Sequence, residues 1–179
     1  MQNTFNVFCE NIKINKITNV IAFKNGLSNV EERRTINLYN ASGNNSLYER
    51  DIPVGHPLKK TGIESIQLLV LDDLINNNRV EIPNIIKIDV EGAELNVLLG
   101  AKEIISKYRP TVIFEYSEET SRDAGYSKDI LLKSLQLVNY NIFGIPENAN
   151  DFRLINEKDF VNEEVSNLIF LPKELVLKD

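Results

Sequence analysis

One ten-residue stretch, Ile85–Glu94, constrains the fold more than any other part of the chain, because it changes from mainly apolar residues to acidic ones partway along. It opens with Ile-Ile-Lys-Ile, and the remaining six residues carry three acids around Gly92. A Pro-Asn pair precedes it, and residues 95–105 after it place apolar side chains at helical spacing. This order predicts a short strand, a tight turn at Gly92 and then a helix. In an open α/β sheet, ligands bind beyond the carboxyl ends of strands, which is where these acids fall.

The remaining chain contains further strand and helix patterns, and the two alternate from Ile66 onward. That alternation predicts an α/β fold with a mostly parallel sheet. Predicted strands lie at Val20–Phe23, Arg34–Tyr39, Ile66–Leu71, Thr111–Tyr116, Asn141–Ile145 and Asn167–Leu171, of which Arg34–Tyr39 reads as half-solvated and antiparallel. Two helices are predicted before the strand at Ile85: an amphipathic one from Thr4 to Ile17, and a short one from Leu71 with two acids at its start. A third helix begins at about Leu95 and must end near Arg109, because Pro110 follows. A fourth helix is predicted from Ser127 to Val138.

The composition limits the classes of partner and compartment. A chain of 179 residues suits one domain, and its net charge of -6, with Lys and Arg scattered, argues against nucleic acid. No apolar run approaches the roughly 20 residues that a membrane helix needs, so no membrane partner is expected. A single cysteine, Cys9, and the lack of a signal peptide predict a reducing, cytoplasmic location.

Charged residues alternate along the strand predicted within Ile85–Glu94, which is unusual for a buried parallel strand. Lys87, Asp89 and Glu91 share one face if the strand is extended, with successive members roughly 6.6 Å apart. One interpretation is that the strand emerges into a cleft lined by the two acids. The other is that Asp89 or Glu91 caps the following helix. A third acid, Glu115, at the end of the next predicted strand favours the cleft.

Three carboxylates can meet at this edge of the sheet. Parallel neighbours lie about 4.8 Å apart, so Asp89, Glu91 and Glu115 can converge on one pocket. Converging carboxylates hold a cation, accept hydrogen bonds from hydroxyls or act as a general base. No His or Cys strengthens a metal site here, so none is predicted.

Several of these segments resemble one protein family. The blocks Lys87–Glu94 and Val97–Ala101, followed by Arg109-Pro110 and Phe114-Glu115, are similar to the signature of FkbM-type methyltransferases. Shorter likenesses are found at Glu10–Asn15, Gly26–Ser28, Leu71–Leu74 and Leu135–Phe143, so the resemblance spans nearly the whole chain.

The resemblance implies a Rossmann-like class I methyltransferase sheet, mostly parallel with an antiparallel C-terminal strand. It further implies transfer of a methyl group from S-adenosyl-L-methionine to a hydroxyl of a sugar or related natural product, with a small-molecule or saccharide acceptor as partner. By position, Asp89 and Glu91 would lie by the methyl-transfer site, and Glu115 would define the acceptor pocket. Gly26, Leu27 and Ser28 would lie near the adenine of the cofactor.

One part of the family pattern is missing from the sequence. Family members carry a first strand with a glycine-containing turn and a second strand ending in an acid, yet no Gly-x-Gly occurs here and Met1 falls after both. We therefore expect residues 1–179 to form a single, partial methyltransferase domain that lacks its first two strands. It would be a fragment, a decayed remnant, or a chain whose missing strands come from a partner chain. The alternative function is a non-catalytic binding or interaction protein that keeps the acceptor side of the fold.

Overall fold

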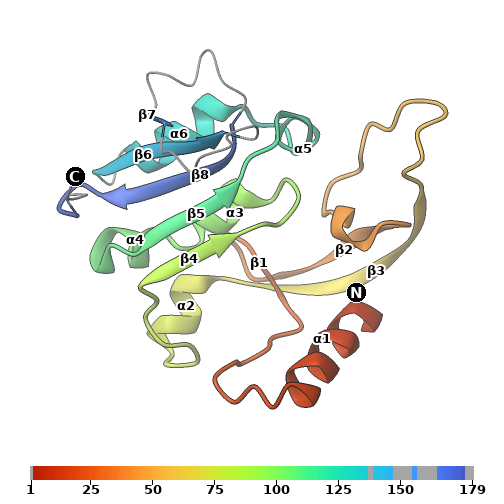
Figure 1. Ribbon diagram of the computed structural model, residues 1–179, viewed down its shortest axis with the longest axis horizontal. Coiled ribbons are helices and arrows are strands. Elements are labelled where there is room, and N and C mark those ends of the chain that lie inside the picture. Colours follow the sequence, from red (N-terminus) through yellow and green to blue (C-terminus); the bar gives the residue numbers. More distant parts are fainter. Residues whose placement is uncertain (1, 137–138, 147–154, 157–164, 176–179) are drawn as a thin grey trace.

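Two β-sheets and six α-helices make up the part of the chain described by the computed structural model, residues 2–136, 139–146, 155–156 and 165–175 (Figure 1). The first sheet has the order β1 (Gly26–Leu27), β3 (Lys60–Leu69) and β2 (Glu32–Tyr39). The second has the order β4 (Ile85–Ile88), β5 (Thr111–Glu115), β8 (Val165–Pro172), β6 (Tyr140–Pro146) and β7 (Ile155–Asn156). The helices are α1 (Gln2–Ile14), α2 (Leu71–Asn76), α3 (Glu94–Leu99), α4 (Lys102–Tyr108), α5 (Glu118–Asp123) and α6 (Lys128–Gln136), with a short 3₁₀ helix, η1, at Ser42–Asn44.

The predicted α/β class is confirmed, whereas the prediction of a mostly parallel sheet is confirmed only in part, because β4, β5 and β6 run in the same direction but most pairs of adjacent strands are antiparallel. Among the described strands, only β1–β3 and β4–β5 pair in parallel, whereas β2–β3, β5–β8, β8–β6 and β6–β7 pair antiparallel. The reason is topological. β3 joins a sheet separate from β4, and β8 inserts antiparallel between β5 and β6, so that one strand creates two antiparallel pairs. The antiparallel C-terminal strand is therefore confirmed.

The first sheet matches the sequence prediction only in part. The antiparallel strand predicted at Arg34–Tyr39 is confirmed as β2. The strand predicted at Val20–Phe23 is wrong, because that segment has no strand beside it in the described structure and Ile21 is 79% exposed. Its backbone would have no hydrogen-bond partners there. The chain instead forms β1 at Gly26–Leu27, where β3 lies alongside.

The single helix predicted after the strand that is now β4 is divided at Gly100 into α3 and α4. The Asp72 carboxylate accepts hydrogen bonds from the main-chain N–H groups of Glu103 (2.9 Å) and Ile104 (3.0 Å), so an acid of α2 caps the start of α4. Asp72 N–H also donates to the carbonyl of Gly100 at 2.9 Å. The predicted end is confirmed, because α4 stops at Tyr108 just before Pro110.

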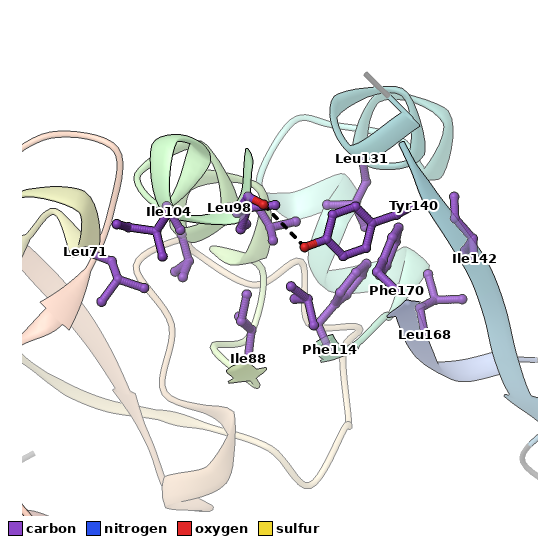
Figure 2. Packing of buried hydrophobic residues seen from close by; sticks show 14 of the residues in the cluster. Leu71, Ile88, Leu98, Ile104, Phe114, Leu131, Tyr140, Ile142, Leu168 and Phe170 are labelled. Carbon is purple, nitrogen blue, oxygen red and sulfur yellow. Dashed lines mark hydrogen bonds between the residues drawn. The ribbon is translucent and has the colours of Figure 1, made fainter. Parts of the chain in front are cut away.

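The main hydrophobic core lies between the second sheet and the helices α2, α3, α4 and α6 (Figure 2). Phe114 of β5 and Phe170 of β8 stack with ring centroids 4.9 Å apart, and both are fully buried. Tyr140 places its hydroxyl in this core, where it donates to the carbonyl of Pro110 at 2.8 Å. Since β5 lies in the middle of this packing, the core fixes the end of β5, and with it Glu115.

The amphipathic helix predicted at the start of the chain is confirmed as α1, although its apolar side chains are only partly covered. Phe8 is 47% exposed and Ile14 67% exposed. With 13 residues, α1 is well short of the roughly 20 needed to cross a bilayer. In the described part of the chain, no helix is long and apolar enough for that.

Candidate functional site

A cavity of about 500 Å³ lies between the two sheets. One wall is formed by β1, β2, β3 and the segment from η1 to Leu47, and the other by the turn after β4 and the end of β5. The volume falls within the roughly 300–1,000 Å³ of typical ligand pockets. The residues that line it include apolar side chains from the first sheet and the acids predicted from the sequence: Gly26, Leu27, Ile36, Leu47, Ile66, Leu68, Asp89, Val90, Glu91 and Glu115.

The structure brings five of the six predicted site residues to this cavity. The three acids line it together with Gly26 and Leu27. Ser28 does not line it, because it is 2% exposed and its carbonyl lies against Gly100. The chemical roles assigned to these residues remain predictions, but their juxtaposition is a property of the fold.

Asp89 and Glu115 project from the ends of the two parallel strands. Asp89 follows β4, is about half exposed and lies 3.6 Å from the Lys87 ammonium. Burial raises the pKa of the Glu115 carboxyl, the negative charge of Asp89 raises it further, and Lys87 acts in the opposite direction. A carboxylate with a raised pKa is a stronger base than an ordinary glutamate, so Glu115 is the best suited of the three acids to accept a proton.

Glu91 lies on the same cavity but is held differently. It has a φ of 54°, a left-handed conformation uncommon outside glycine, and β4 already ends at Ile88. The face predicted to carry Lys87, Asp89 and Glu91 in alternation is therefore wrong at Glu91, because the chain has left the strand. Its carboxylate forms an ion pair with the guanidinium of Arg50.

The turn between β4 and α3 depends on Gly92 and on a buried acid. Gly92 has a φ of 103°, and a Cβ there would stand 2.8 Å from the carbonyl oxygen of Thr120. The Glu94 carboxylate accepts hydrogen bonds from the N–H of Gly92 (3.1 Å), the N–H of Val90 (3.3 Å) and the hydroxyl of Tyr126 (2.8 Å). Burial raises the pKa of Tyr126, which keeps that donor protonated.

Two residues that organise the site, Glu94 and Arg50, were not predicted from the sequence. The alternative in which Asp89 or Glu91 caps the following helix is wrong, because the N-cap of α3 is Ala93 and it is Glu94 that accepts from the N–H groups of the turn. Its position in the first turn of a helix after a glycine turn was the available signal. Arg50 lies 41 residues from Glu91 in an irregular segment, and no local pattern marks it.

The side chains that line the cavity restrict the kind of ligand that the cavity can hold. Apolar side chains on one wall suit a flat ring, and carboxylates on the other suit a positively charged group or hydroxyls. Within the described residues, no group of three His, Cys, Asp or Glu side chains is placed to hold a metal ion.

Comparisons with known proteins agree on one family. The family model described as Methyltransferase FkbM domain matches residues 2–142. Methyltransferase 1 of Beauveria bassiana (strain ARSEF 2860) is 29% identical over 110 residues, which cover 54% of this chain and 44% of that protein. The crystal structure of Methyltransferase FkbM from Methylobacillus flagellatus KT has a TM-score of 0.51 at 20% identity, and covers 94% of this chain and 33% of its own, a likeness of fold. The chain thus spans less than half the length of either protein.

Proposed function

Because the chain belongs to the FkbM methyltransferase family, as its sequence resemblance predicted, we propose that it transfers a methyl group from S-adenosylmethionine to a hydroxyl of a sugar or related natural product. The observation that carries this proposal is the meeting of Asp89, Glu91 and Glu115 with Gly26 and Leu27 on one cavity. The family match does not favour the alternative of a non-catalytic binding protein.

The residues around the cavity suit the cofactor in charge and in apolar surface. S-adenosylmethionine, when bound, would supply a methyl group from a positively charged sulfur, which would keep the electrons of the broken carbon–sulfur bond. Asp89 and Glu115 place negative charge on the cavity wall, which suits a positively charged group. Leu27 and Leu68 offer an apolar surface for the adenine ring.

Glu115 is the residue we assign as proton acceptor. A hydroxyl must lose its proton as the new carbon–oxygen bond forms, and a positioned base provides typically 10²–10⁴-fold of rate. Burial and the neighbouring acids raise the pKa of Glu115, which strengthens it as a base. Asp89 lies beside it on the same cavity and is assigned to orient the acceptor hydroxyl.

The test begins with binding and then adds turnover. Calorimetry of the purified, folded chain with S-adenosylmethionine should give heat of binding, and a radiolabelled methyl group should pass to a glycoside from a panel of acceptors. Asp89→Asn should abolish transfer while the circular dichroism spectrum is retained. Asp73→Asn, an exposed acid on α2 outside the cavity, is the matched control and should leave transfer unchanged. Absence of binding heat in a folded sample would overturn the proposal for this chain.

A further inference from the structure

We propose that Arg50 is a positioning residue of the methyl-transfer site, which fixes the Glu91 carboxylate and offsets its charge so that Glu115 is left as the proton acceptor. The part of this inference that concerns proton transfer rests on the proposed function. The part that concerns the charges of Arg50, Glu91 and Glu115 does not, and it can be measured without turnover.

The ion pair of Arg50 and Glu91 is largely withdrawn from solvent. The Arg50 side chain is 7% exposed and the Glu91 side chain 25% exposed. The Nε atom of Arg50 is buried and has no hydrogen-bond partner among the described residues, so the bond from Nη2 to Glu91 is the main compensation for its charge. Arg50 is also fixed through its main chain, because its N–H donates to the buried Tyr39 hydroxyl at 3.0 Å.

A bridging segment, Ser46–Arg50, holds the turn after β4 at more than this one point. The Ser46 hydroxyl donates to the main-chain carbonyl of Glu91 at 2.6 Å and accepts from the N–H of Tyr48 at 3.1 Å. The Tyr48 hydroxyl accepts from the side-chain amide of Asn96 at 2.8 Å. Main chain and carboxylate of Glu91 are therefore both held by the same segment, and the side chain is not free to swing toward an acceptor.

The three acids of the cavity consequently differ in their charge partners. Glu91 is paired with Arg50, and Asp89 lies 3.6 Å from Lys87. Within the described residues, Glu115 alone of the three forms no ion pair within 4.0 Å. The negative charges of Asp89 and Glu91 both act on Glu115 and raise its pKa. Because Arg50 is bonded to Glu91, it reduces the field that Glu91 exerts on Glu115.

A double-mutant cycle on Arg50 and Glu91 tests this arrangement directly. In a protein labelled with ¹³C at the glutamate carboxyl groups, the titration of Glu115 is followed by NMR and assigned with Glu115→Gln. Arg50→Met should shift the Glu115 midpoint upward, and Glu91→Gln should shift it downward, each by about 0.5–1 pH unit. The double variant should titrate close to wild type, because it removes one charge of each sign.

Two further variants separate this role from a merely structural one. Arg50→Lys keeps the cation and should leave the Glu115 titration near wild type, even if Arg50→Met fails to fold. Lys60→Met removes a cation from the exposed ion pair with Glu49 (2.7 Å), and the Glu115 titration should also stay unchanged in this variant. Glu115 midpoints that stay fixed in Glu91→Gln, or single-variant shifts that do not cancel in the double variant, would overturn the inference. Expected titrations in a chain that transfers no methyl group would uphold the charge arrangement and reject the proposed function.

Discussion

The carbonyl oxygen of Ser28 lies so close to the α-carbon of Gly100 that a Cβ at Gly100 would stand 2.0 Å from it. Ser28 continues from β1, and its N–H donates to the carbonyl of Leu69 at 2.8 Å, so this contact belongs to the first sheet. Gly100 belongs to the break between α3 and α4 over the second sheet. The two halves of the molecule therefore meet main chain to main chain at a point where only glycine fits.

Gly100→Ala should lower the free energy of unfolding by about 1–3 kcal/mol, since the new methyl group has rigid backbone on the other side. Urea denaturation gives this value. Gly62→Ala is the matched control, because a Cβ at Gly62 meets nothing within 4 Å and its φ is not positive. Equal stability of the two variants would contradict the close approach.

Asp72→Ala should cost about 1–2 kcal/mol, because the start of α4 loses the carboxylate that accepts from two of its N–H groups. Asp73 is the neighbouring acid and is exposed, so Asp73→Ala should stay within about 0.5 kcal/mol of wild type. Thermal unfolding of both variants provides the comparison. A loss in Asp73→Ala as large as that in Asp72→Ala would show that the charge at α2, rather than the cap on α4, is responsible.

Glu94→Gln should reduce stability by about 1.5–3 kcal/mol, because a buried carboxylate that accepts three different donors is replaced by a neutral amide with donors of its own. The turn that carries Glu91 would loosen with it. Glu103→Gln, on the exposed side of α4, is the control and should be near neutral. Chemical denaturation measures both, and a neutral Glu94→Gln would mean that the turn does not depend on this acid.

Glu115→Gln should lower methyl transfer by about 10²–10⁴-fold if Glu115 is the proton acceptor. A base must be ionised to act, so wild-type turnover should rise with pH through the pKa of Glu115 and then level off. Because burial raises that pKa, the acid limb should lie above the range of an ordinary glutamate, about 4.3. A pH–rate profile of kcat/KM tests this. An acid limb that persists unchanged in Glu115→Gln would assign it to another group.

The same shift in pKa has an effect on stability. A carboxyl whose pKa is higher in the folded than in the unfolded state makes the fold less stable as pH rises through that interval. Glu115→Gln removes this penalty, so its gain in unfolding free energy over wild type should grow from acidic to neutral pH. Solvent screening keeps the gain below about 1 kcal/mol. Denaturation curves at several pH values would show no such trend if Glu115 were unperturbed.

The sequence predicts those features of the fold that neighbouring residues determine, and it does not predict those that depend on contacts between distant segments. Ile85–Glu94 carries a local signal, so β4, the turn at Gly92 and the acids at its end follow from the pattern. The division into two sheets does not, because the apolar run that predicts the strand at Ile66–Leu71 does not indicate which strand it pairs with. The break at Gly100 likewise depends on Asp72, which lies on another helix.

The candidate site divides in the same way. Asp89 and Glu115 end neighbouring parallel strands, so their meeting on one cavity follows from strand geometry. Glu91 departs from the predicted face because its backbone is left-handed. In this conformation its carbonyl accepts from the Ser46 hydroxyl and its carboxylate pairs with Arg50. Those contacts join segments far apart in the chain, and sequence periodicity carries no information about them.

The cavity has one wall on each sheet, so neither sheet forms it alone. Thermodynamic linkage follows: any ligand that binds the assembled cavity but not the unfolded chain stabilises the docking of one sheet on the other. At a hundredfold excess over its Kd, such a ligand adds about 2.7 kcal/mol to the unfolding free energy. Conversely, any substitution that weakens the docking also weakens binding, even from a position outside the cavity.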